Sequence, residues 1–150
     1  MHTHSTIEAS PDPDSRHERG YTYIQAIFGA TGTHFVERIH AISPDFANHI
    51  VDFAYGDIMS RPALDLVSRE LAIVSALTAL GKTPEVLEVH IHGALNVGCT
   101  PAALLEVMIQ MAVYAGFPTA IQGMQALKTV LNTRGISLTT LSNPPVEASQ

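Results

Sequence analysis

The chain has 150 residues, of which 46% are hydrophobic and only 15% are charged, and its formal net charge is −6. This length fits one domain, and the eight lysines and arginines are scattered, which argues against a nucleic-acid-binding protein. Because little charge is available to cover so much apolar surface, the composition favours a homo-oligomer.

The N-terminal segment and the cysteine content bear on the cellular compartment. Residues 1–13 are polar and contain no apolar run, so we expect neither a secretory signal nor a membrane anchor, and no later stretch is apolar enough for a membrane span. Cys99 is the only cysteine, which excludes an intrachain disulfide framework and is typical of a reducing cytoplasm. His2 and His4 lack the ligand spacing of a metal site. We therefore expect a cytoplasmic protein that binds no metal.

Capping residues and apolar spacing in the middle of the chain predict a series of helices. Hydroxyl residues precede prolines at Ser43-Pro44, Thr83-Pro84 and Thr100-Pro101, a pattern typical of helix N-caps, and glycines at 29, 81, 98, 116 and 135 stand where helices end. The apolar residues between them recur with a period of about 3.6. In chain order, the predicted helices cover residues 16–28, 34–41, 44–57, 65–80, 84–97, 101–115 and 118–134. The sequence thus predicts an all-α, single-domain bundle of six to seven helices over residues 15–136, with tails at 1–14 and 137–150.

The helix predicted at 65–80 carries an acidic residue among apolar ones. Glu70 falls on the same face as Leu66, Val74 and Leu77. A carboxylate taken out of water costs free energy unless it is paired or used. The residues leave two interpretations open: Glu70 ties down a neighbouring loop, with Arg61 or Arg69 as its partner, or it takes part in catalysis.

The helix predicted at 84–97 has its two histidines on different faces. His90 shares an apolar face with Val86, Gly93 and Val97, whereas His92 lies on the polar face. The short connection at 81–83 makes this helix an antiparallel neighbour of the preceding one, and the rise of about 1.5 Å per residue gives an axial offset of about 6 Å between Glu70 and His90. The two side chains are therefore predicted to meet, although an inward histidine is more often a structural residue than a catalyst.

Two further residues lie at helix ends. Glu106, Gln110 and Tyr114 form a polar line on the apolar helix 101–115, and Tyr114 stands beside the chain break at 116–118, where its phenol could reach a cavity. Cys99 precedes a helix start, a position that can lower a thiol pKa, although a small apolar filler is the simpler interpretation.

Four segments, in this order and spacing, resemble the successive signatures of the carboxymuconolactone decarboxylase family. They are YGDIMSRPALD at 55–65, SREL at 68–71, HIHGALNVGCT at 90–100 and VYAGFPTA at 113–120. The resemblance extends from about residue 16 to 131. It implies a fold similar to the alkylhydroperoxidase D proteins, small all-helical subunits that assemble into trimers or hexamers.

The resemblance leads to two chemistries, and the cysteine content separates them. Alkylhydroperoxidase D proteins carry a Cys-x-x-Cys pair soon after the Arg-Glu-Leu segment, and the second thiol resolves the first during peroxide reduction. Here the corresponding residues 81–86 read GKTPEV, and Cys99 lies too far along the chain to replace either cysteine. A dithiol peroxidase is therefore disfavoured.

The decarboxylase branch implies loss of carbon dioxide from 4-carboxymuconolactone to give 3-oxoadipate enol-lactone in aromatic catabolism, without a cofactor. Such a reaction needs a stabilised oxyanion and a proton returned to carbon. The resemblance implies His90 as general acid/base, Glu70 as the carboxylate that orients it, and Tyr114 as a donor to the oxyanion.

The small-molecule substrate, a carboxylated lactone, is expected to contact Arg61 or Arg69 through its carboxylate, because arginine presents a planar fork suited to that group, and Phe117 is expected at the same site. Ile121 and Gln122 stand where some decarboxylases carry an asparagine, which leaves the substrate open. A cofactor-free enzyme acting on another lactone or aromatic metabolite, and a non-catalytic oligomeric protein, remain alternatives.

Overall fold

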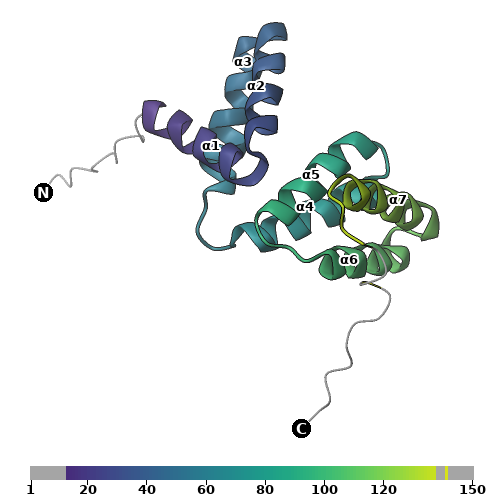
Figure 1. Ribbon diagram of the computed structural model, residues 1–150. Helices are drawn as coiled ribbons and strands as arrows, with labels where there is room; N and C mark the ends of the chain where they lie inside the picture. Colours follow the sequence, from purple (N-terminus) through teal and green to yellow (C-terminus); the bar gives the residue numbers. More distant parts are fainter. Residues whose placement is uncertain (1–12, 138–140, 142–150) are drawn as a thin grey trace, which may run out of the picture. The chain divides into compact units, whose positions relative to one another are not determined.

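The protein is described by a computed structural model that covers residues 13–137 and 141 (Figure 1). Its elements, in chain order, are α1 (Pro13–Phe28), α2 (Ala30–Ile42), α3 (Pro44–His49), the π-helix η1 (Ile50–Met59), α4 (Leu66–Leu80), α5 (Pro84–Asn96), α6 (Pro101–Tyr114) and α7 (Phe117–Thr133). The described residues form no strand, so the predicted all-α fold class is confirmed. The predicted tails lie mostly outside these residues.

Most helix boundaries follow the predicted capping residues. The Ser43 hydroxyl accepts a hydrogen bond from the Phe46 amide at 3.4 Å, and the Thr100 hydroxyl accepts one from the Ala103 amide at 3.1 Å. Gly81 ends α4 in the left-handed conformation, at φ 62°, which glycine adopts without steric cost. Thr83 is the N-cap residue of α5 and Pro84 follows it, as predicted, but the Thr83 side chain makes no capping hydrogen bond.

The contacts of the chain group into two compact units, of which the first contains residues 29–61 and the N-terminal part up to 25. Within it, α1 packs very closely on η1: a Cβ at Gly20 would lie 2.1 Å from the Val51 carbonyl oxygen. The guanidinium of Arg16 forms an ion pair with Asp57 at 2.7 Å, and His17 Nδ1 lies 2.6 Å from Asp52 Oδ1.

The segment predicted as one α-helix over 44–57 continues to Met59 and changes to π-helical winding from Ile50 onward. The Gly56 carbonyl oxygen accepts hydrogen bonds from Arg19 Nε at 2.7 Å and from the Ser60 hydroxyl at 2.6 Å. The side chains of Arg19 and Ser60 thus satisfy the Gly56 carbonyl oxygen in the wider π-helical winding. Apolar spacing over ten residues does not distinguish π-helical from α-helical winding, which explains the difference.

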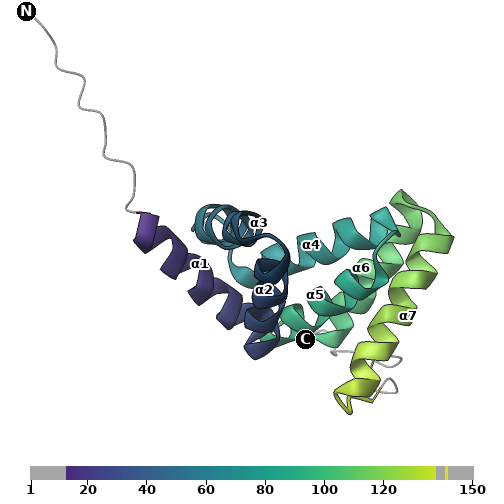
Figure 2. The same ribbon diagram turned by 90° about the horizontal axis from the view of Figure 1, so that it is seen from above.

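The second unit contains residues 26–28 and the chain from residue 62 onward. In it α4 packs against α5, α6 and α7, and α7 also packs against α5 and α6 (Figure 2). Its core consists of buried apolar side chains: Val74, Leu87, Ile91, Ala94, Cys99, Leu104, Met108, Ala126, Leu127, Val130 and Leu131. The α4–α5 hairpin that the sequence predicts is thus present and carries the candidate site.

The described part of the chain has neither a membrane-spanning helix nor a cluster of metal-ligand side chains. None of its helices combines the length and the apolar character needed to cross a membrane. No group of three or more histidine, cysteine, aspartate or glutamate side chains within it is placed to hold a metal ion.

Candidate active site

Glu70 is a completely buried carboxylate. It lies in the second turn of α4, whose start is fixed by Asp65, a side chain that accepts a hydrogen bond from the Ser68 amide at 2.8 Å. The exposed fraction of Glu70 is 0%. Its Oε2 lies 3.0 Å from His90 Nδ1, whereas no described residue forms a hydrogen bond with Oε1. An unpaired buried oxygen costs free energy, so a purely stabilising role does not explain why this carboxylate is buried.

His90 lies on α5 and faces both the carboxylate and an aromatic ring. Its side chain is 16% exposed, and its ring centroid lies 5.3 Å from that of Phe28 in an edge-to-face arrangement. An ionised Glu70 can only accept a hydrogen bond, so Nδ1 carries the proton in this contact. In the neutral ring, Nε2 is then the basic nitrogen. The contact that the spacing predicts between Glu70 and His90 is confirmed, while the role of each residue in a reaction stays a prediction.

Cys99 is a buried thiol near the pair. Its Sγ donates a hydrogen bond of 3.6 Å to the Val67 carbonyl oxygen. Burial above all, and then the negative charges of Glu70 and Asp65, raise the pKa of the Cys99 thiol. The possibility of a lowered pKa at this helix start is therefore wrong. A thiol that stays protonated and buried is a poor nucleophile, which agrees with its interpretation as an apolar filler.

Tyr114, the predicted oxyanion donor, and two of the predicted substrate-binding residues, Arg61 and Phe117, are exposed, whereas Arg69 is partly buried. Tyr114 at the end of α6 is 78% exposed and Phe117 at the start of α7 is 72% exposed. Arg69 donates a hydrogen bond from Nε to the Leu64 carbonyl oxygen at 3.2 Å. Arg61 is exposed and belongs to the first unit. Nothing in the structure tests the roles of these four residues, which stay predictions.

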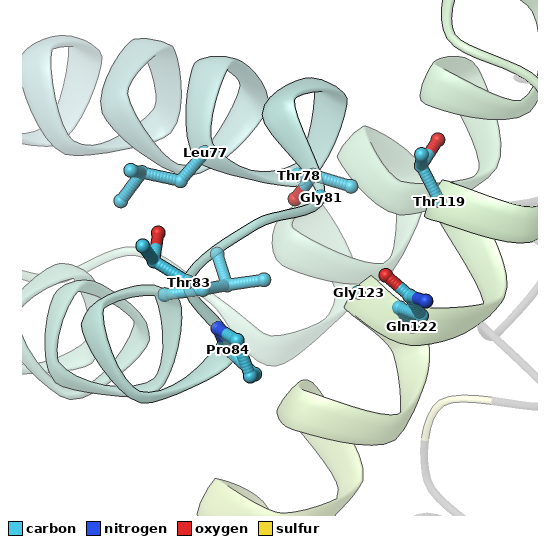
Figure 3. Close-up of a pocket in the computed structure, with 9 residues that line it drawn as sticks. Leu77, Thr78, Gly81, Thr83, Pro84, Thr119, Gln122 and Gly123 are labelled. Atoms are coloured by element: carbon cyan, nitrogen blue, oxygen red, sulfur yellow. The ribbon is translucent and has the colours of Figure 1, made fainter.

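Figure 3 shows a hollow in the second unit, and neither Glu70 nor His90 lines it. It measures about 250 Å³, including the solvent space at its mouth, and is lined by Leu77, Thr78, Gly81, Thr83, Pro84, Leu87, Thr119, Gln122 and Gly123. None of these residues is charged, and two threonine hydroxyls already donate to backbone carbonyls. Leu77 is seven residues from Glu70, about 10 Å along α4. The hollow therefore lacks the groups that would bind and decarboxylate a carboxylic acid.

Sequence reasoning missed the surroundings of His90. The spacing of the sequence marks Phe28 only as the end of a predicted helix and gives no role to Asn96. In the structure Phe28 contacts the His90 ring, and the Asn96 Nδ2 donates a hydrogen bond to the Ile27 carbonyl oxygen at 2.8 Å. These contacts join segments that are far apart in the chain, and no local spacing signals them.

Comparisons with known proteins show which family the chain belongs to. The model of the carboxymuconolactone decarboxylase family matches residues 44–129, a range that includes Glu70 and His90. The chain is 33% identical over 102 residues to 4-carboxymuconolactone decarboxylase of Acinetobacter baylyi, covering 68% of this chain and 75% of the relative. It is 31% identical over 83 residues to nitrosuccinic acid decarboxylase of Metarhizium robertsii, covering 55% of this chain and 57% of the relative. It is also 31% identical over 90 residues to peroxisomal protein 2 of Schizosaccharomyces pombe, covering 59% and 42% of the two chains.

Proposed function

This chain belongs to the carboxymuconolactone decarboxylase family, and on that premise we propose that it is a cofactor-free decarboxylase that converts 4-carboxymuconolactone to 3-oxoadipate enol-lactone, a step of aromatic catabolism. The observation that carries the proposal is the buried contact of 3.0 Å between Glu70 and His90. Two relatives support the reaction class, because both are named as decarboxylases of carboxylic acids.

The proposed reaction places its proton chemistry at His90. When the bond between the substrate carbon and its carboxylate breaks, the electron pair is delocalised toward the lactone carbonyl oxygen. An imidazolium at His90, stabilised by the Glu70 carboxylate, donates its Nε2 proton to the substrate carbon and becomes neutral. A proton from solvent then restores the imidazolium.

Glu70 acts through His90 in this proposal. Since Glu70 is fully buried, a substrate has no access to it, whereas His90 retains an exposed edge. The carboxylate fixes which ring nitrogen faces inward and lowers the free energy of the imidazolium form. Glu70 is thus a positioning residue, and His90 is the catalytic residue.

The remaining roles belong to three exposed side chains and to the partly buried Arg69. We assign to Tyr114 the donation of a hydrogen bond to the oxyanion, to Arg61 or Arg69 the binding of a substrate carboxylate, and to Phe117 an apolar contact. Water competes for an exposed donor, so Tyr114 contributes less than His90 unless a neighbouring copy covers it. A trimeric or hexameric homo-oligomer, which the composition and the resemblance both favour, would supply that cover.

A second candidate substrate follows from one relative. Nitrosuccinic acid, as its name states, is an acyclic dicarboxylic acid with a nitro group, and decarboxylation beside that group leaves an electron pair that the nitro group can hold. The same acid/base pair would serve both reactions. The two candidates differ in the electron sink and in the shape of the site.

A substrate panel tests both candidates. Carbon dioxide release from 4-carboxymuconolactone and from nitrosuccinic acid would be followed by mass spectrometry, with lactone ring opening scored in parallel. We expect release from the lactone without ring opening. Ring opening without carbon dioxide would indicate a lactone hydrolase, and turnover of nitrosuccinic acid alone would favour the second candidate. No turnover in the panel, together with a loss of stability in His90→Gln, would favour a structural pair in a non-catalytic protein.

A further inference from the structure

A polar network fixes the C-terminal end of α5. Arg134, which directly follows α7, donates from Nε to His92 Nδ1 at 3.0 Å, from Nη2 to the His92 carbonyl oxygen at 3.2 Å, and from Nη2 to Asn96 Oδ1. Asn96 in turn donates from Nδ2 to the Ile27 carbonyl oxygen at 2.8 Å. Arg134 after α7 and Asn96 at the end of α5 thus hold the backbone at Ile27.

The orientation of the Asn96 amide is determined by its neighbours. Arginine has only donors, so the amide oxygen must face Arg134, and a backbone carbonyl can only accept, so the amide nitrogen must face Ile27. Both requirements are met in one orientation. Arg134 therefore prepares Asn96 to hold residue 27.

The segment that Asn96 holds lies directly against the candidate catalytic residue. A Cβ at Gly93 would lie 2.7 Å from the Phe28 ring and 2.8 Å from the Ile27 side chain, so the absence of a side chain at 93 allows this close approach. Ile27 is 0% exposed. Phe28 then meets the His90 ring edge to face, at a centroid distance of 5.3 Å. Two contacts thus fix the imidazole, Glu70 at one nitrogen and Phe28 at the ring.

We propose that Asn96, oriented by Arg134, is a positioning residue that holds Phe28 against His90 and so keeps the His90 ring in the orientation that serves proton transfer. This inference rests on the proposed function, since it assigns the network to the same reaction. It extends the site to Phe28 and Arg134, which both lie outside the segment matched by the family model.

The first test uses Asn96→Asp. The carboxylate still accepts from Arg134 but repels the Ile27 carbonyl, so folding is retained while the hold on residue 27 is lost. We expect kcat to fall about fivefold or more with KM within about twofold, because a misplaced acid/base group affects the chemical step. Exposed Asn48→Asp adds the same charge on the other unit and is expected to change neither value.

A spectroscopic arm measures His90 itself, independently of turnover. Imidazole nitrogen NMR would be recorded on ¹⁵N-labelled protein, with the His90 signals assigned from His90→Gln. We expect one set of His90 ring-nitrogen signals in the wild type and shifted or broadened signals in Asn96→Asp, because a ring that Phe28 no longer holds samples more than one orientation. Should Asn96→Asp not fold, Arg134→Gln, at an exposed position, is expected to give the same change at smaller amplitude. Unchanged His90 signals in the folded variants would overturn the proposal, even if the wild type releases carbon dioxide.

A double-mutant cycle tests the route through Phe28. Phe28→Leu removes the ring but keeps apolar volume, and we expect Asn96→Asp to add less than about twofold to its effect on kcat or on the His90 signals. Fully additive effects would show that Asn96 does not act through Phe28. If no acid in the panel is turned over, the proposed function fails while the NMR arm of this test still decides the positioning role.

Discussion

The described residues contain two histidine–carboxylate pairs, one in each unit, and the two pairs differ more in burial than in distance. His17 and Asp52 approach to 2.6 Å, with side chains that are 38% and 27% exposed. His90 and Glu70 approach to 3.0 Å, but their side chains are 16% and 0% exposed. The shorter contact is the less unusual one, because water can solvate both of its partners. Only the buried pair retains charge-bearing groups where packing alone would favour apolar ones.

The largest expected contrast lies between the two histidines. His90→Gln should lower the rate of carbon dioxide release about a hundredfold or more, the usual contribution of a general acid/base group. His17→Gln should leave it within about twofold. Steady-state assays of both variants, with helical circular dichroism as the folding control, measure the difference. Equal effects would remove the distinction between the pairs.

The two carboxylates provide the next contrast. Glu70→Gln keeps a group that can accept from His90 but removes the charge that stabilises an imidazolium, so we expect turnover to fall well over tenfold while the protein stays folded. Asp52→Asn removes a half-exposed charge and should change turnover by less than about twofold. Turnover retained in Glu70→Gln would contradict the positioning role of this carboxylate.

Substitutions at one glycine in each unit distinguish an effect on stability from an effect on turnover. Gly20→Ala places a Cβ against the Val51 backbone, and Gly93→Ala places one against the Phe28 ring. Each should lower the free energy of unfolding by about 1 to 3 kcal/mol. Only Gly93→Ala should also lower kcat several-fold in the folded fraction, as Phe28 moves from His90. Denaturant unfolding and activity assays on the same samples measure both effects. A loss of kcat in Gly20→Ala would argue against the assignment.

The smallest expected effect concerns a third histidine, which faces a cation. Burial first, and the positive charge of Arg134 second, lower the pKa of His92 below 6.5, although Glu88 acts in the opposite direction. The unfolded chain then binds the proton more readily than the folded one, so this contribution to stability is complete above about pH 6.5 and is lost as the pH falls.

We expect the melting temperature to drop by a few degrees at most between pH 7.5 and 5, and His92→Gln to reduce that drop. Thermal scans at both pH values measure it, with exposed His34→Gln as the matched control. A drop unchanged by His92→Gln would show that other groups govern the acid sensitivity.

Local chemistry explains which parts of the molecule were predictable. Ser43, Thr100 and Gly81 fix helix ends through contacts within a few residues, and the hairpin from α4 to α5 follows from its short turn. The contact between Glu70 and His90 could be predicted because both lie at known distances from that turn. These features depend on spacing alone.

The unpredicted features depend on contacts between distant segments. The π-helical winding of η1, the Phe28 contact and the bonds of Arg134 all require knowledge of which helix faces which. Exposure is a similar case: Tyr114 and Phe117 belong to an apolar stretch of sequence, yet their side chains point outward in the single chain. Periodicity identifies a face of a helix but not the partner that covers it.

The unpaired Oε1 of Glu70 has a consequence for the history of such proteins. A buried acid with one oxygen unpaired among the described residues is costly, and replacing both Glu70 and His90 by apolar side chains of similar volume should be neutral or stabilising. Under the proposed function, relatives that abandon catalysis should therefore lose both members of the pair together. Under the proposed function, the acid at position 70 therefore serves turnover at the expense of stability.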